Sequence, residues 1–386
     1  MSKSSTGYSL KEYCQMFADT PRMEAYFQAL KKFITPESVV VDIGSGPGIF
    51  SLLACELGAK KVYAIEPDIS ILPAQNLARL NGYGDRIECI RDISTQIELH
   101  EQADIIISDL RGVLPLFEQH IPSIIDARER FLAPGGNMIP QSDSLWISVM
   151  ESPDQYECCV TPWQGNDYGL DLSSLKHLLE NTLHKIRPPE GSLLAEPTHL
   201  YKIDYKTVTH SGFQQKRVLN IQRDGVGHGL MIWFDCTTCD GEHFSNSPNM
   251  DELVYGVGYL PWTEAVKFVA GDQLTVDIGS HLIESNYIWT WQTQLPTSNH
   301  SGEKTFSQTS FNGEILDIDR LRKTKDNYIP KLTDSGEAEL MVLNQIKQTF
   351  PLGHIAHNLQ HDFPDQFPSY TKALSYVGDL STRFSA

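Results

Sequence analysis

Residues 39–50 have the sequence VVVDIGSGPGIF, and this stretch decides the fold. Three consecutive valines are typical of a strand that is buried on both faces of a sheet. Three glycines at alternate positions allow the backbone to turn tightly and to approach a ligand closely. The helix expected next, over residues 49–57, directs its N-terminal amides towards the same ligand. We therefore expect a strand, a glycine turn and a helix that form a ligand site.

An acidic residue identifies the kind of ligand. Glu66 follows a second predicted strand, residues 61–65, and lies eighteen residues after Gly48. A carboxylate at this place accepts hydrogen bonds from both hydroxyls of a ribose. A dinucleotide and S-adenosylmethionine both fit a nucleoside site of this kind, and a glycine turn without a ligand is the third alternative. Asp42, an acid inside the first strand, favours S-adenosylmethionine over a dinucleotide.

Composition restricts the class of protein. The chain has 386 residues, enough for two or three domains, and a net charge of −18. This charge argues against a nucleic-acid partner and is compatible with a cationic substrate or simply with a solvated acidic surface. Seven scattered cysteines favour reduced thiols in the cytoplasm. The pair Cys236 and Cys239 has no matching second pair, so we expect no metal site. Without an apolar run of about 20 residues, we expect no membrane span.

The order of predicted elements gives the domains. N-terminal helices are expected over residues 1–36, and strands alternating with helices predict a parallel sheet over 37–141. Short alternating strands over 142–312 predict a β-sandwich or barrel. A helical insertion within it, about residues 160–195, predicts a projecting arm that contacts a partner. Residues 296–313 are rich in Ser, Thr, Asn and Gly and indicate a loop or linker. Residues 313–386 indicate a small helical module.

Two carboxylates flank one loop of the predicted sheet. Asp109 follows the fourth strand, at the edge where such sheets bind ligands, and Glu118 comes nine residues later. Two carboxylates on a glycine-containing loop are able to clamp a planar cation through paired hydrogen bonds and to accept its proton. The alternative is that both acids only interact with the dipole at the start of a helix.

Several motifs in order resemble one family. They are MFADTPRMEAY (16–26), VVDIGSGPGI (40–49), AIE (64–66), IIISD through Glu118 (105–118), ARE with LAPGG (127–136) and WQGNDYGLD (163–171). Over about residues 8–295 the chain resembles the protein arginine N-methyltransferases, as a divergent, prokaryotic-like member. The resemblance implies a Rossmann-like class I methyltransferase domain, then a β-barrel with a helical dimerisation arm. It also implies S-adenosylmethionine as cofactor, a protein or peptide (or small guanidine) substrate and a homodimer.

The resemblance also implies roles for single residues. Asp109 and Glu118 become the catalytic carboxylates that hold the guanidino nitrogen of arginine. Arg22 matches the arginine that binds the cofactor carboxylate. Seven residues are then expected to bind the cofactor: Arg22, Asp42, Gly44, Gly46, Glu66, Asp92 and Ile93, the last two beside the adenine.

Three positions depart from the family pattern. Asp109 replaces a glutamate, so its carboxylate is one methylene shorter. Arg111 stands where relatives carry an uncharged residue lining the substrate pocket; it would repel a guanidinium, pair with Asp109 or Glu118, or bind a substrate carboxylate. Leu260-Pro261-Trp262 replaces Thr-His-Trp and retains only Trp262 as a pocket wall. These departures leave two alternatives open: a different nitrogen acceptor, on a peptide or a small molecule, or a non-catalytic cofactor-binding adaptor.

The C-terminal module, residues 313–386, lies outside the resemblance. Its sequence faintly resembles small winged-helix domains that bind peptides. That reading implies a peptide substrate guided by a leader segment. The alternative is a helical cap on the barrel.

Overall fold

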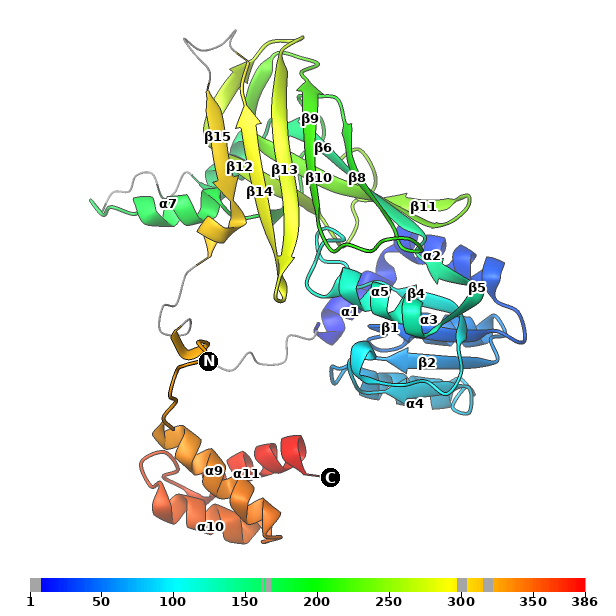
Figure 1. Ribbon diagram of the computed structural model, residues 1–386, viewed down its shortest axis with the longest axis vertical. Helices are drawn as coiled ribbons and strands as arrows, with labels where there is room; N and C mark the ends of the chain where they lie inside the picture. The colour runs from blue at the N-terminus through cyan, green and yellow to red at the C-terminus, as the bar shows by residue number, and fades with distance from the viewer. Residues whose placement is uncertain (1–7, 161–162, 164–167, 297–303, 315–321, 386) are drawn as a thin grey trace. The chain divides into compact units, whose positions relative to one another are not determined.

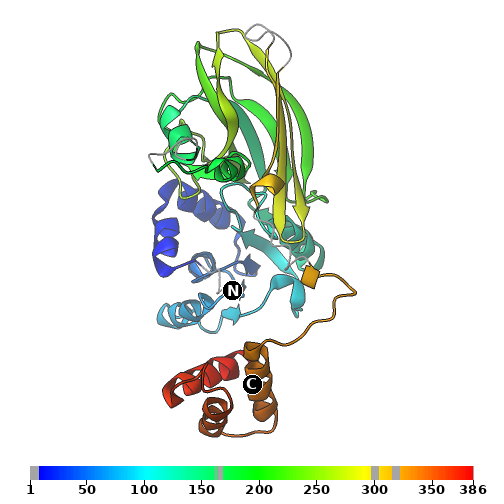
Figure 2. The ribbon, with the colours of Figure 1, turned by 90° about the vertical axis from the view of Figure 1, so that its left-hand side faces the viewer.

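The computed structural model describes residues 8–160, 163, 168–296, 304–314 and 322–385. The chain divides into two compact units, Met1–Ile315 and Leu316–Ala386. The first unit contains a parallel α/β domain followed by an antiparallel β domain, drawn in blue to cyan and in green to yellow (Figures 1 and 2). Within the described residues, none of the helices is long and apolar enough to cross a membrane.

The α/β domain is built on a five-stranded parallel sheet with the order β3-β2-β1-β4-β5. The strands are β1 (Val39–Ile43), β2 (Lys61–Ile65), β3 (Ile87–Ile90), β4 (Ala103–Ser108) and β5 (Leu132–Ile139). The crossover helices are α3 (Ile49–Glu56), α4 (Ile71–Leu80) and α5 (His120–Arg130), with a short helix η1 (Ser94–Gln96). Every residue of β1 is buried, as its run of valines predicts. This sheet places the ends of β1, β2 and β4 side by side.

Two helices precede the sheet. Helix α1 (Leu10–Ala18) begins with a capping box, in which the side chain of Ser9 accepts from the backbone of Glu12 and Glu12 bonds back to Ser9. Helix α2 (Thr20–Phe33) begins after Asp19, whose carboxylate accepts from the backbone N–H of Arg22. This cap fixes the first turn of α2, which carries Arg22 into the interior.

The antiparallel domain consists of two sheets. Their orders are β7-β12-β10-β6-β8, with β11 added to β10, and β15-β14-β13-β9. The strands are β6 (Ser142–Met150), β7 (His184–Ile186), β8 (Thr198–Asp204), β9 (Phe213–Asn220), β10 (Gly225–Cys239), β11 (Glu242–Ser245), β12 (Val257–Phe268), β13 (Gln273–Ile283), β14 (Asn286–Gln294) and β15 (Thr305–Thr309). The predicted fold class, a Rossmann-like domain followed by a β-barrel domain, is confirmed.

Two segments of this barrel differ from the prediction. Part of the expected loop 296–313 forms strand β15, in which Phe306 and Gln308 point inward and are buried. Gln308 donates to the carbonyls of Glu180 (2.7 Å) and Pro261 (2.9 Å). These hydrogen bonds allow a polar side chain to occupy a buried position in the strand. Strand β12 runs through Pro261, which faces Gly229 where the register of β10 shifts. A bulge of this kind tolerates a proline inside a strand.

The arm carries two short helices, α6 (Pro153–Cys159) and α7 (Ser173–Glu180). Helix α7 projects from the barrel (Figure 1). The chain then forms strand β7, so part of the insertion predicted to be helical, about residues 160–195, is a strand. Residues 161–162 and 164–167 of the predicted arm lie outside the described residues.

The second unit contains helices α9 (Asp334–Lys347), α10 (Leu352–Asp362) and α11 (Tyr370–Phe384). Nine buried residues form its own core: Ala338, Val342, Ile355, Ala356, Leu359, Phe367, Ala373, Val377 and Leu380. Residues 322–385 contain no strand, so the wing expected of a winged-helix domain is absent from this part of the chain. Three helices around one apolar core account for the module by themselves.

Candidate functional site

The glycine turn lies at the carboxyl end of β1. Gly44 and Gly46 have φ angles of +69° and +52°, which side chains rarely adopt. The backbone N–H groups of Gly44 and Ser45 donate to the carbonyl of Ile65 at the end of β2, over 2.9 and 3.1 Å. A Cβ on Gly46 would lie 2.5 Å from Cε1 of Tyr13 in helix α1. Helix α1 therefore packs directly against the glycine turn through Tyr13.

Two acids support this turn. Oε2 of Glu66 accepts from the N–H of Gly46 (3.0 Å), and Oε1 accepts from the N–H of Asp68 (2.9 Å). Burial raises the pKa of Glu66. Asp42 lies inside β1, where Oδ2 accepts from the hydroxyl of Ser51 over 2.7 Å. Burial raises the pKa of Asp42 to about 7.

The residues at this edge fit a nucleoside. The hydroxyl of Ser45 is buried and, among the described residues, has no hydrogen-bond partner. Asp92 and Ile93 follow β3 and are exposed, Ile93 by 45%. An unpaired hydroxyl, a buried carboxylate and an exposed apolar side chain suit a sugar and a flat base. The roles of these residues in binding a cofactor remain predictions.

Arg22 reaches from α2 to the end of β4. Its Nε donates to Oδ2 of Asp109 (2.6 Å) and to the hydroxyl of Tyr255 (3.0 Å). Its Nη1 donates to the carbonyl of Met16 (3.1 Å), and its guanidinium lies 5.1 Å from the ring centre of Phe50. Burial acts to lower the pKa of Arg22, but the neighbouring Asp109 carboxylate raises it above its usual value. The guanidinium expected to meet the cofactor carboxylate thus faces a carboxylate of the protein.

Asp109 is surrounded by donors. Oδ2 accepts from Arg22 and, over 2.5 Å, from the hydroxyl of Tyr255, while Oδ1 accepts from Nη1 of Arg111 over 2.8 Å. Burial acts to raise the pKa of this carboxyl, but the charges of Arg22 and Arg111 lower it to about 2. Asp109 is therefore a fixed anion and a poor proton acceptor.

Arg111 folds back into the protein. Its side chain is 0% exposed, and it forms a two-pronged pair with Asp143, from Nε to Oδ2 and from Nη2 to Oδ1, both 2.9 Å. Its other contacts are the hydroxyl of Tyr26 (2.8 Å), Oδ1 of Asp109 (2.8 Å) and Sγ of Cys236 (3.1 Å). A guanidinium has five N–H donors, and these contacts use all five. Of the three expected possibilities, the structure shows pairing with Asp109.

Glu118 ends the same loop in a different environment. Its side chain is exposed, and its φ of +40° is unusual for a residue with a side chain. The loop is tight, because a Cβ on Gly112 would lie 2.4 Å from the ring of Phe117. Helix α5 starts at His120, so Glu118 lies in the loop before the helix. Burial raises the pKa of Tyr8, and the charges of Asp109 and Glu118 raise it further. Both carboxylates therefore act on the same tyrosine.

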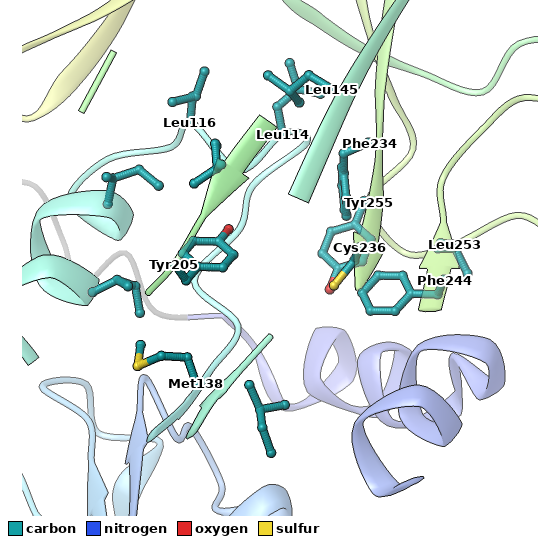
Figure 3. Close-up of a cluster of buried hydrophobic side chains, with 14 of the residues drawn as sticks. Leu114, Leu116, Met138, Leu145, Tyr205, Phe234, Cys236, Phe244, Leu253 and Tyr255 are labelled. Carbon is teal, nitrogen blue, oxygen red and sulfur yellow. The ribbon is translucent and has the colours of Figure 1, made fainter. Parts of the chain in front are cut away.

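Aromatic residues of the barrel complete the site. Figure 3 shows Phe234, Phe244 and Tyr255 together with Cys236. Phe244 and Tyr255 stack with ring centres 6.1 Å apart, and the guanidinium of Arg111 lies 5.4 Å from the ring centre of Phe234. Besides helix α2 and the loop after β4, the barrel therefore also contributes residues to the Asp109 site.

The residues that surround Arg111 were not among the predicted site residues. Asp143, Tyr26, Tyr205 and Cys236 come from segments far apart in the chain. An aspartate at the start of an otherwise alternating strand was the single signal for Asp143. The family resemblance implied that Trp262 lines the substrate pocket. The structure buries its side chain fully among barrel residues, with Phe268 and Phe306 beside it, so that role remains a prediction.

His120 is a second buried group near this network. Its Nδ1 bonds to the carbonyl of Pro115 (2.7 Å), and its Nε2 has no partner among the described residues. Burial and then the charge of Arg111 lower the pKa of His120 to about 4. His120 is therefore neutral at pH 7. Within the described residues, no group of three His, Cys, Asp or Glu side chains is placed to hold a metal, and all seven cysteines are free.

Comparison with known proteins agrees with this geometry. Residues 22–140 match the family model "Ribosomal protein L11 methyltransferase (PrmA)". The chain is 30% identical over 230 residues to "Probable protein arginine N-methyltransferase 6" of Arabidopsis thaliana, covering 57% of this chain and 53% of that protein. It is 29% identical over 293 residues to "Protein arginine N-methyltransferase 6" of Danio rerio, covering 70% and 82%. The chain is a relative of the protein arginine N-methyltransferases.

A solved structure shows that this relationship extends to the fold. The "Trypanosoma brucei PRMT1 enzyme-prozyme heterotetrameric complex with AdoHcy" superposes with a TM-score of 0.73 at 21% identity, over 80% of this chain and 99% of that one. The present chain nevertheless spans only about half the length of the Arabidopsis arginine methyltransferase.

Proposed function

We propose that the protein is an S-adenosylmethionine-dependent N-methyltransferase that acts on the guanidino nitrogen of arginine in a protein or peptide. The observation that supports this proposal is the loop between β4 and α5, which carries Asp109 and Glu118 beside the glycine turn. Its relatives are named arginine methyltransferases, and a structural neighbour was solved with AdoHcy. The net charge of −18 suits a cationic substrate.

The residues of the glycine turn would hold the cofactor. Glu66 would bind the ribose hydroxyls, and Asp42, Gly44 and Gly46 would lie along the methionine part. Arg22 would bind the carboxylate, and Asp92 with Ile93 would contact the adenine. Bound S-adenosylmethionine supplies an electrophilic methyl group on a sulfonium.

Asp109 and Glu118 would have different roles towards the acceptor. Asp109, a fixed anion, orients the guanidinium and balances its charge. Glu118 is exposed and free of the arginine network, so it suits the role of proton acceptor. Transfer of the methyl group to the acceptor nitrogen would leave one surplus N–H proton, which the carboxylate of Glu118 would accept.

The test separates binding from transfer. Glu118→Gln should lower methyl transfer from labelled cofactor to an arginine-containing peptide by roughly 10²-fold or more, the effect of losing a general base. Binding of S-adenosylhomocysteine should stay within about twofold, measured by calorimetry. Glu129 on α5 has a side chain that is 65% exposed, and Glu129→Gln is the matched control. It should leave both methyl transfer and binding of S-adenosylhomocysteine unchanged. Full activity of the Glu118→Gln enzyme would contradict the proposal.

A second candidate acceptor is a different nitrogen, on a peptide side chain or a small molecule. Arg111 favours it, because this residue already occupies one oxygen of Asp109. Preference for a lysine-containing peptide over its arginine counterpart would support this alternative. A non-catalytic adaptor is the third candidate, and methyl transfer to any partner would exclude it.

The arm supports a homodimer. Three apolar residues in or beside α7 are exposed, Tyr168 by 85%, Leu170 by 61% and Leu175 by 37%. Apolar residues of α4 and the turn before it are exposed too: Ile69, Leu72 and Leu80. We infer that the arm of one copy covers such a face on another. The free thiols support a cytoplasmic location. From the sequence we also propose a peptide substrate guided by a leader segment and no nucleic-acid partner.

A further inference from the structure

The turn between β13 and β14 contacts the loop that carries Glu118. In Figures 1 and 2 this turn extends from the barrel to the α/β domain beside α5. There Nε2 of Gln119 donates to the carbonyl oxygen of Glu284 over 2.8 Å. The two residues are 165 positions apart in the chain, so the contact joins the barrel to the residue that directly follows Glu118. The proposed reaction assigns no role to this contact.

Gln119 uses its side chain for this contact and not for its own helix. It is the N-cap residue of α5, a position from which a side chain often accepts a hydrogen bond from the first turn, but its side chain forms no such bond. Its backbone carbonyl accepts from the N–H of Ser123 over 2.9 Å. The backbone of Gln119 is therefore held by α5, while its side chain reaches the barrel.

The residues beside this contact have unusual backbone angles. Among the described residues, three that are not glycine have a positive φ, and two of these are Glu118 (+40°) and Glu284 (+55°). Glu284 is the first residue of a two-residue turn closed by the pair Ile283 and Asn286, a place that favours glycine. Such angles persist where the surrounding structure holds them. The hydrogen bond of Gln119 connects the two strained segments.

Short hydrogen bonds hold the backbone on both sides of Glu118. The N–H of His120 donates to the carbonyl of Phe117 over 3.0 Å, and Nδ1 of His120 bonds to the carbonyl of Pro115 over 2.7 Å. Within the part of the chain that the structure describes, the side chain of Glu118 itself has no hydrogen-bond or ion-pair partner. Its direction therefore depends on the backbone of residues 117–120, which Gln119 ties to the barrel.

We propose that Gln119 is a positioning residue that sets the direction of the Glu118 carboxylate by binding the β13–β14 turn. The inference rests on the proposed function, in which Glu118 accepts the proton of the acceptor nitrogen. A general base acts only within hydrogen-bond reach of the proton that it takes, so a small displacement of its backbone lowers the rate. The barrel thus acts on the transfer step through a backbone carbonyl.

The test compares the turnover of Gln119→Met with that of the wild-type full chain, using labelled S-adenosylmethionine and an arginine-containing peptide. Methionine has the length of glutamine but no N–H, so this variant removes the donor and keeps the shape. The kcat should fall about three- to tenfold, the effect of losing one hydrogen bond that holds the loop. The KM for the peptide and the affinity for S-adenosylhomocysteine should stay within about twofold.

The matched control is Gln102→Met, at an exposed glutamine before β4, which should leave all three values unchanged. An unchanged kcat of the Gln119→Met enzyme overturns the proposal.

A double variant shows whether Gln119 acts through Glu118. The Glu118→Gln enzyme has no carboxylate to position, so adding Gln119→Met should lower its kcat by less than about twofold. A further fall by the full factor seen in the wild-type background would mean that Gln119 acts independently of Glu118. That result also overturns the proposal.

Hydrogen exchange tests the contact without turnover. Loss of the donor should speed exchange of the backbone N–H groups of residues 117–120 about three- to tenfold and leave β1 unchanged, measured by mass spectrometry. Unchanged exchange in residues 117–120 overturns the proposal. A wild-type protein that methylates no arginine peptide would contradict the proposed function, while exchange would still decide whether the turn holds this loop. An enzyme that responds to Glu118→Gln but not to Gln119→Met would contradict only the role of Gln119.

Discussion

Nε of Arg22 lies 2.6 Å from Oδ2 of Asp109, which joins helix α2 to the carboxyl end of β4. The side chains are both 7% exposed, so this is a buried pair rather than a surface contact. Under the proposed function, Arg22 would serve the cofactor and Asp109 the acceptor. The pair would therefore link the two binding events, because a cofactor that takes Arg22 would remove one of the two donors, Arg22 and Tyr255, that Oδ2 of Asp109 now accepts from.

Replacing Arg22 should weaken cofactor binding. Arg22→Met removes a charge-assisted contact with the cofactor carboxylate, and we expect the affinity for S-adenosylhomocysteine to fall roughly 10- to 100-fold. Calorimetry measures this directly. Arg79→Met, on the exposed end of α4, is the control and should leave the affinity unchanged. Equal affinities of the wild type, Arg22→Met and Arg79→Met would show that Arg22 does not bind the cofactor.

The glycine turn offers a matched pair of substitutions. Gly46 and Gly82 have φ angles of +52° and +76°, but a Cβ would meet Tyr13 at Gly46 and open space at Gly82. Gly82→Ala should cost only the backbone strain, about 1–2 kcal/mol in urea unfolding. Gly46→Ala should cost more and should also reduce binding of S-adenosylhomocysteine, because α1 must move. Identical losses of stability would mean that α1 does not press on the turn.

Asp42 should make stability depend on pH. Its pKa of about 7 lies above the usual value near 3.8, so the folded protein binds the proton more tightly than the unfolded chain. The stability from this group is complete below about pH 4 and is lost as pH rises towards 7. Asp42→Asn removes the effect. Its stability relative to wild type should therefore improve by about 2–4 kcal/mol between pH 4 and pH 8 in urea unfolding. A constant difference would mean that Asp42 is ionised throughout.

Charge placed on the arm should separate a dimer. Leu175→Glu combined with Leu170→Glu puts two carboxylates on the exposed apolar side of the arm, and desolvating them in an interface is costly. Light scattering should then give the mass of one chain, 43.4 kDa, in place of two. Leu332→Glu is the control, since that leucine is also exposed (56%) but lies in the second unit. A dimer that survives the arm variant would place the interface elsewhere.

The second unit should be dispensable for cofactor binding. Its apolar core is separate from that of the first unit. A chain ending at Ile315 should therefore fold and bind S-adenosylhomocysteine with unchanged affinity. Loss of transfer to a peptide but not of cofactor binding would assign the helices to substrate capture. Loss of both would show that the first unit depends on the second.

Local patterns predicted most of the fold. The valines of β1, the glycine turn and Glu66 are close together in sequence, and the strands they imply are in the structure. Strand β15 escaped prediction because its buried Gln308 is polar, and its partners, the carbonyls of Glu180 and Pro261, are distant in the chain. Burial of a polar residue depends on those partners, so its own sequence carries no sign of it.

The candidate site was predictable only along single segments. Asp109, Arg111 and Glu118 belong to one loop, and their spacing indicated a shared role. Asp143 neutralises Arg111 from another domain, 32 residues away, and no spacing rule connects the two. The direction of the Arg111 side chain therefore could not be predicted from the sequence.

The five satisfied donors of Arg111 also constrain how such a chain can change over generations. A lone substitution at position 111 leaves the carboxylate of Asp143 buried without a cation, and a lone substitution at 143 leaves the guanidinium without its main partner. Each intermediate is less stable than either end point, so the two positions must change almost together. A lineage that acquired this pair would therefore tend to keep it, even when its substrates changed.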